Sequence, residues 1–168
     1  MFSAHDPSDI DRFFRGLTEY AFHTRLGVVD PPLVDYVSAL LVRFLRNETP
    51  PSSAVATEAA DVSHLLVEAA SHARHTGPDE AREEYRHIGD VTLFWTGLYP
   101  EALRPLQQRG LRDPLDAYRE TGKRAYWLAS RLEPATAALE RRLLERLSSG
   151  YDLCVEGLAE VRRIWGES

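Results

Sequence analysis

The chain has 168 residues, 43% of them hydrophobic, and a formal net charge of −6. This length suits one domain whose core is large enough to need no disulfide or metal as a staple. The acidic balance argues against nucleic-acid binding, because phosphate contacts dominate the affinity of such proteins and require a basic face. The only cysteine is Cys154, so no intramolecular disulfide can form, which fits a reducing, cytoplasmic compartment.

The sequence predicts no membrane association. The N-terminal residues lack the basic and then apolar pattern of a secretory signal peptide. The most apolar stretch, residues 33–45, is interrupted by Asp35, Ser38 and Arg43. It is also shorter than the roughly 20 apolar residues that a membrane-spanning helix needs.

In the first half of the chain, apolar residues recur at the three-to-four spacing of amphipathic helices. The first predicted helix begins near Pro7 or Ser8 and is ended by Gly27. Asp30-Pro31 has the residue types of an N-cap followed by a first-turn proline, and predicts the start of a second helix that is central to the fold.

The segment 47–53 is a loop by its turn residues, and a third helix is expected over 56–75. A fourth helix opens at Pro78. The composition of residues 91–95 would suit a strand, but we assign them to this helix because its period continues from Ala81.

In the second half, a short helical piece begins at Pro100 and ends near Gly110, and a long helix begins at Asp113-Pro114. Glu133-Pro134 ends that helix, and two further helices are separated by Gly150. We therefore predict an all-α fold: a single-domain antiparallel helical bundle of about six to seven helices spanning residues 1–168.

Four glycines fall inside predicted helices, where each costs about 1 kcal/mol relative to alanine. They are Gly16, Gly89, Gly122 and Gly157. We interpret them as points where helices pack closely, the alternative being close approach to a ligand.

A polar pair, His87 and Asp90, enters the most apolar part of the chain and needs partners there. Lys123 and Tyr126, also three apart, are the candidates on the fifth long helix. Lys123 is the first choice for Asp90, Tyr126 is the second, and Arg86 is the local competitor. One interpretation is a hydrogen-bond network that sets helix register.

The alternative is a ligand-binding pocket at the same place. His87 and Asp90 would form one wall, and Lys123 and Tyr126 the other. Trp95 and Tyr99 would supply an apolar lining.

Metal binding is a weaker hypothesis. The third helix carries His64, Glu68 and His72 at four-residue intervals, a spacing that suits zinc or another divalent metal. Glu84 and His87 form one Glu-x-x-His motif of the kind found in carboxylate di-iron bundles, but that architecture needs two such motifs and a second copy is absent. We favour a solvated helix face for His64, Glu68 and His72, and expect no cofactor.

No nucleophile elbow, phosphate-binding glycine loop, nucleotide fingerprint or paired Cys-x-x-Cys occurs, and Cys154 lies on an apolar stripe. The segments RHIGDVTLFWTGLYPEAL (86–103) and GKRAYWLAS (122–130) resemble those of an uncharacterised group of bacterial all-helical proteins. That resemblance implies a bacterial cytosolic setting and transfers no catalytic residue.

The sequence therefore favours a non-enzymatic helical module that binds a protein partner or associates with itself. The first alternative is a small-molecule-binding bundle or enzyme that uses the polar pocket. The second alternative is a metal-binding bundle.

Overall fold

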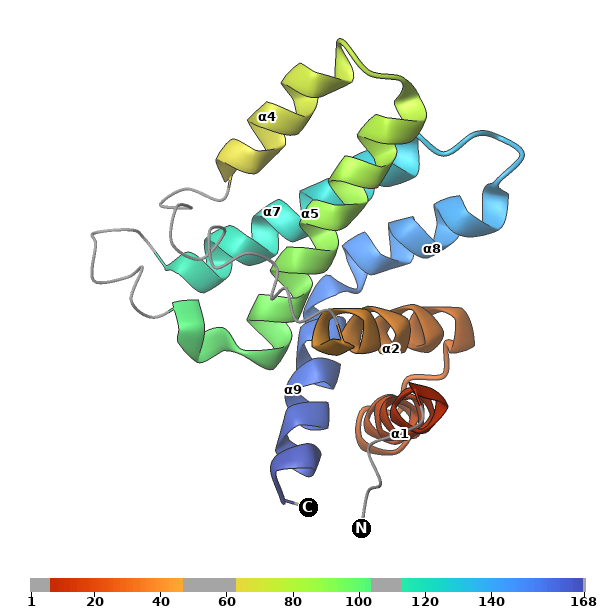
Figure 1. The fold of residues 1–168 in the computed structure, drawn as a ribbon, viewed down its shortest axis with the longest axis vertical. Helices are drawn as coiled ribbons and strands as arrows, with labels where there is room; N and C mark the ends of the chain where they lie inside the picture. The colour runs from red at the N-terminus through yellow and green to blue at the C-terminus, as the bar shows by residue number, and fades with distance from the viewer. Residues whose placement is uncertain (1–6, 47–62, 104–112, 168) are drawn as a thin grey trace.

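The computed structural model describes residues 7–46, 63–103 and 113–167 (Figure 1). In chain order its elements are α1 (Pro7–Glu19), the π-helical turn η1 (Tyr20–Arg25), α2 (Pro31–Arg46), α4 (Ser63–Ala73), α5 (Pro78–Leu98), the 3₁₀ turn η2 (Pro100–Leu103), α7 (Pro114–Arg131), α8 (Ala138–Ser149) and α9 (Tyr151–Glu167). This part of the chain holds seven α-helices and no strand, and residues 91–95 lie inside α5. The predicted loop 47–53, the first residues of the predicted third helix and Gly110 lie outside the described residues.

Helix ends follow the residue chemistry expected from the sequence. Gly27 has a positive φ of 67°, a conformation that suits glycine, between η1 and α2. The Asp30 carboxylate accepts a hydrogen bond from the Leu33 backbone N–H at 3.3 Å. The Asp113 carboxylate accepts one from the Leu115 N–H at 3.1 Å. Both carboxylates thus satisfy N–H groups that have no partner within the first helical turn.

Helix α5 lies at the centre of the arrangement and contacts α2, α4, α7 and α9. The helices run in several directions rather than along one common axis: α1 is seen almost end-on, whereas α9 runs down the page (Figure 1). The all-α prediction is confirmed, but the regular antiparallel order is not. None of the described helices is long and apolar enough to span a membrane.

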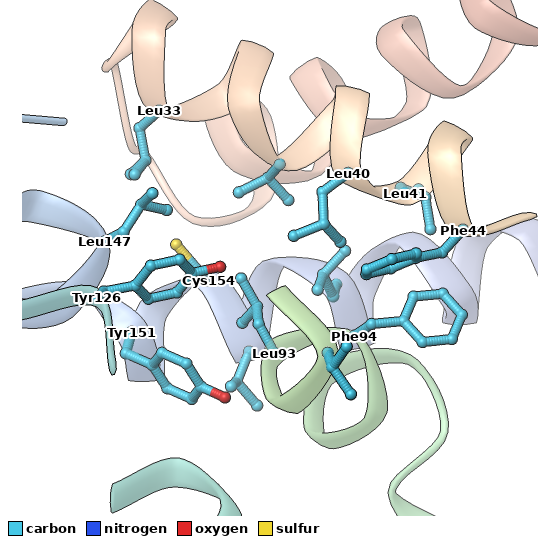
Figure 2. Close-up of a cluster of buried hydrophobic side chains, with 14 of the residues drawn as sticks. Leu33, Leu40, Leu41, Phe44, Leu93, Phe94, Tyr126, Leu147, Tyr151 and Cys154 are labelled. Atoms are coloured by element: carbon cyan, nitrogen blue, oxygen red, sulfur yellow. The ribbon is translucent and has the colours of Figure 1, made fainter. Parts of the chain in front are cut away.

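The core forms where α2 crosses α5 and α9. Leu40, Leu41 and Phe44 of α2 point toward Leu93 and Phe94 of α5 (Figure 2). All five side chains are at most 8% exposed. Burying a large apolar side chain of this kind stabilises the fold by about 1.5–3 kcal/mol, so this contact holds the N-terminal helices onto the rest of the chain.

Three of the four glycines that the sequence analysis placed inside helices mark close contacts, as predicted. A side chain at Gly89 would meet the Tyr126 ring, at Gly122 it would meet Thr92 and Tyr151, and at Gly157 it would meet Phe22. Gly16 is the exception, because nothing in the described structure lies within 4 Å of the position a Cβ would take.

Candidate functional site

The carboxylate of Asp90 is the best-connected buried polar group in the described structure. Asp90 is only 1% exposed and lies midway along α5. Its Oδ1 accepts hydrogen bonds from the hydroxyls of Tyr36 and Tyr126, each at 2.7 Å. Its Oδ2 accepts one from Arg43 Nη2 at 2.6 Å. We call these four residues the Asp90 network.

Three helices bring the network together. Tyr36 and Arg43 are seven residues apart on α2, which is about two helical turns, so both lie on the side that faces α5. Tyr126 comes from α7 and fits against Gly89, where a Cβ would stand 2.6 Å from the tyrosine ring. The residue before Asp90 therefore makes room for one of its hydrogen-bond donors.

The electrostatics keep both phenols protonated. Burial, followed by the negative charge of Asp90, raises the pKa of Tyr36 well above its usual value, and the same two causes raise that of Tyr126. Neutral hydroxyls donate to the carboxylate, and the Arg43 guanidinium balances its charge. A buried carboxylate paired in this way is tolerated because both of its oxygens are occupied.

The expected partners of Asp90 are half right. Tyr126, the second choice, is confirmed. Lys123, the first choice, is wrong: its ammonium lies 2.8 Å from Asp152 of α9. Arg86, the local competitor, instead bonds Glu83 at 2.7 Å. Lys123 is 31% exposed, so its charge stays near water, where a long flexible side chain is better solvated.

The remaining residues of the predicted pocket do not surround Asp90. His87 is exposed, with its ring edge toward Phe44 at a centroid distance of 6.5 Å. Residues three apart on a helix differ by about 60° in direction, which is enough to put His87 at the surface and Asp90 in the core. Trp95 and Tyr99 contact each other and Phe94. The Trp95 indole N–H is buried and has no partner among the described residues.

Tyr36 and Arg43 are the members of the network that the sequence did not assign to the site. A signal was present, since Arg43 interrupts the most apolar segment of the chain. A cation on the edge of a central helix needs a counter-charge, and Asp90 supplies it.

The metal candidates form one pair rather than a site. His72 Nδ1 lies 3.1 Å from Glu84 Oε1, on exposed faces of α4 and α5. Glu68 is also exposed, and the side chain of His64 lies outside the described part. Among the described residues, no group of three or more His, Cys, Asp or Glu side chains stands close enough to hold a metal ion.

Two surface hollows are present in the described structure, and the second shares one residue with the Asp90 network. The first, which we call the α7 groove, has a volume of about 520 Å³ and is lined by Leu66, Glu120, Thr121, Lys123, Arg124, Trp127 and Ser148. The second, which we call the arginine hollow, has a volume of about 390 Å³ and is lined by Asp11, Arg15, Ser38, Ala39, Val42, Arg43 and Arg46. The α7 groove thus contains Lys123, and the arginine hollow contains Arg43 of the Asp90 network.

Comparison with known proteins adds no assignment. No family model matches the chain, and neither the curated proteins nor the solved structures give a match. Any function must therefore be inferred from the described surfaces and from the chemistry of their side chains.

Proposed function

We propose that the chain is a non-enzymatic, cytoplasmic helical module that binds an acidic amphipathic helix of a protein partner in the α7 groove. The observation that carries the proposal is the exposed indole of Trp127 beside the basic residues Lys123 and Arg124 in that groove. A helix seated in an apolar groove is a common mode of peptide recognition.

The buried reactive groups support a non-enzymatic role. Both oxygens of Asp90 are occupied by side chains of the fold. Cys154 is fully buried, and burial raises the pKa of its thiol to about 12. A thiol in this state is not a nucleophile at neutral pH, because only the thiolate reacts. A buried, reduced thiol also suits the cytoplasm.

The apolar part of the α7 groove comes from two helices. Leu66 of α4 is half-buried, and Trp127 of α7 is 45% exposed. The guanidinium of Arg131 lies over the Trp127 ring at 4.9 Å, which holds the indole at the surface. Exposed tryptophans with ordered neighbours are the residues most often found to dominate the free energy of protein binding.

The charge of the groove selects the partner. Lys123 is paired with Asp152 and with Glu120, which also lines the groove, whereas Arg124 has no ion-pair partner among the described residues. Arg131 adds a second cation at the edge of the indole. A helix with apolar residues on one face and Asp or Glu flanking them would cover Trp127 and supply the missing counter-charges.

The test uses a displayed library of amphipathic helices with a constant leucine face and with Glu, Gln or Lys at the flanking positions. Selection against the wild-type chain is expected to enrich glutamate. The best binder should lose about tenfold or more in affinity for Trp127→Ala, which is the effect of removing an interface hot spot. Leu139→Ala is the control, since Leu139 is 76% exposed and does not line the groove.

Three results would contradict the proposal. One is enrichment of lysine or of no charge, and another is equal binding by the Trp127→Ala and Leu139→Ala variants. The third comes from sedimentation: a wild-type dimer that Trp127→Ala converts to a monomer would show that a second copy of the chain covers the groove.

A further inference from the structure

We propose that α4 is a conformational switch, which opens away from α5 and α7 while the rest of the chain stays folded, and which completes the α7 groove only when it is docked. The opening follows from the packing of α4. Its effect on binding rests on the function proposed above for the α7 groove.

Helix α4 lies at the edge of the molecule, where it contacts α5 and α7 (Figure 1). Of residues 65–73 only Ala69 is buried, whereas more than half of the residues of α5 are buried. The other α4 residues that pack against the core are only partly buried; they are Leu65, Leu66 and Ala73. The free energy gained on burial is proportional to the apolar area removed from water, so α4 is held weakly.

The polar link between α4 and α5 adds little to this docking. His72 Nδ1 lies 3.1 Å from Glu84 Oε1, and the two side chains are 62% and 35% exposed. Exposed pairs of this kind contribute little, because water and salt screen them. A helix of 11 residues is also too short to be stable in water on its own. Helix α4 should therefore unwind when it leaves α5 and α7.

Trp95 gives an independent indication that the docked position is not ideal for its surroundings. Leu65 of α4 and Trp95 of α5 both pack against the cluster of Leu103 and Tyr118. The indole N–H of Trp95 is buried and has no hydrogen-bond acceptor within the described structure. A buried donor without a partner is unfavourable, and water that enters when Leu65 moves away would supply the acceptor. This donor thus favours the open state.

The position of α4 decides whether the α7 groove is complete. Leu66 and Trp127 are the large apolar residues in its lining, and Leu66 is the one that comes from α4. An amphipathic helix in the groove contacts both side chains only when α4 is docked. A ligand that prefers one of two states shifts the population toward it, so groove binding and α4 docking should stabilise each other.

Hydrogen–deuterium exchange of the free full chain at pH 7.5, followed by mass spectrometry, tests the opening without a partner. The backbone amides of residues 67–73 should be protected at least about 100-fold less than those of residues 88–98 in α5, because only the latter require unfolding of the core. Tyr126→Phe removes one hydrogen bond of the core, away from α4. It should speed exchange in residues 88–98 by about tenfold and leave α4 unchanged.

A second pair of variants tests what holds α4 in place. Leu65→Ala should speed exchange in α4 by about tenfold, because it removes the side chain that packs against Leu103 and Tyr118. Val67→Ala is the matched control, since Val67 lies on the same helix and is 64% exposed. Its α4 amides should exchange as in wild type, and both variants should keep the wild-type circular dichroism spectrum.

The regulation is tested by repeating the exchange with the glutamate-flanked helix selected for the α7 groove, at about 100 times its Kd. Exchange in α4 should slow by about tenfold or more, toward the roughly 100-fold limit for a ligand that binds the docked state alone. Bound helix that leaves α4 exchange unchanged overturns the regulation. If no helix binds, the function proposed for the groove fails with it, whereas the free chain still decides the opening.

Three results on the free chain would overturn the opening. The first is equal protection of α4 and residues 88–98. The second is an equal response of both segments to Tyr126→Phe, which would mean that α4 exchanges only when the whole core unfolds. The third is equal exchange in the Leu65→Ala and Val67→Ala variants.

Discussion

At the residue scale, the Asp90 network shows how a carboxylate can be accommodated inside a helical core. Asp90 receives two neutral donors and one cationic donor, and these come from α2 and α7. Because Arg43 remains partly in water, only one of the two charges is fully desolvated. This lowers the energetic cost below that of an ion pair with both partners buried.

Replacing Asp90 is the direct test of this account. Asp90→Ala leaves two buried phenol hydroxyls and a guanidinium without their acceptor, so we expect a loss of about 2–4 kcal/mol in the free energy of unfolding. Denaturant unfolding followed by circular dichroism measures it. Asp152→Ala is the control, since that carboxylate is 58% exposed in its ion pair with Lys123 and should cost at most about 1 kcal/mol. Equal losses in the two variants would show that the network contributes no more than a surface ion pair.

A second residue-scale prediction concerns Cys154. The thiol is fully buried and burial raises its pKa to about 12, so the native protein should react slowly with iodoacetamide at pH 8. Mass spectrometry with and without denaturant measures the alkylated fraction. Labelling as fast in the native protein as in the denatured one would mean that the core around α9 opens readily.

The sequence identified the centre of this site but only some of its partners. An aspartate entering an apolar run must be paired, and this physical rule singled out Asp90 and Tyr126. Lys123 was the first choice because it lies three residues from Tyr126 on the same helix. The direction of a long side chain, however, depends on which oppositely charged group lies within its reach, and for Lys123 that group is Asp152. Asp152 is distant in sequence from Lys123, and Tyr36 and Arg43 are distant from Asp90. The periodicity of a single helix therefore could not predict these contacts.

At the element scale, the close approach of α5 and α7 depends on missing side chains. The ring of Tyr126 occupies the space above Gly89, and Thr92 and Tyr151 occupy the space above Gly122. Each of the two helices thus has a glycine against which a side chain of the other helix packs. The spacing is too small for alanine at either position unless the partner helix shifts.

This predicts opposite effects for two Gly→Ala substitutions in helices. Gly89→Ala should destabilise the protein by about 1–3 kcal/mol, because the added methyl overlaps the Tyr126 ring and displaces a donor of Asp90. Gly16→Ala should stabilise it by up to about 1 kcal/mol, because alanine favours the helix and meets nothing there. Thermal and denaturant melts of the two variants measure whether each substitution raises or lowers the stability relative to wild type. A destabilised Gly16→Ala, or a neutral Gly89→Ala, would contradict this account of the packing.

Elements were easier to predict than their arrangement. Caps, prolines and three-to-four periodicity are local signals, and they placed the starts of α1, α2, α5 and α7. The crossing directions of the helices depend on ridges and grooves made by residues from different segments. A single sequence does not show which helix faces pack against each other, which is why the expected antiparallel order is not confirmed.

At the scale of the whole molecule, protonation of buried tyrosines links the fold to pH. Burial raises the pKa of Tyr36, Tyr126 and Tyr151 above the usual value of 10.0. These residues join α2, α7 and α9 to the central α5, so they connect most of the core. Burial also raises the pKa of Tyr85, of Tyr118 and of the Cys154 thiol, so these groups add to the same pH dependence.

The sign of the pH dependence follows from linkage. In the unfolded chain a tyrosine loses its proton near pH 10, whereas Tyr36, Tyr126 and Tyr151 keep theirs in the fold, so above about pH 10 the native state binds more protons. Stability is therefore fully present below about pH 9, where the Cys154 thiol begins to lose its proton in the unfolded chain only. It falls as the pH rises further, and above pH 10 each buried tyrosine adds about 1.4 kcal/mol per pH unit to the decline. Urea melts from pH 8 to 11 should show a plateau followed by this decline.

Tyr126→Phe should be less stable than wild type at pH 8, because a hydrogen bond to Asp90 is lost. Its stability should then fall less steeply with pH, by the contribution of one buried tyrosine. Tyr20→Phe, at a 47% exposed position, should decline as steeply as wild type. Parallel curves for wild type and Tyr126→Phe would mean that the Tyr126 phenol ionises in the fold as readily as in water, and would remove the basis for its role as a permanent donor to Asp90.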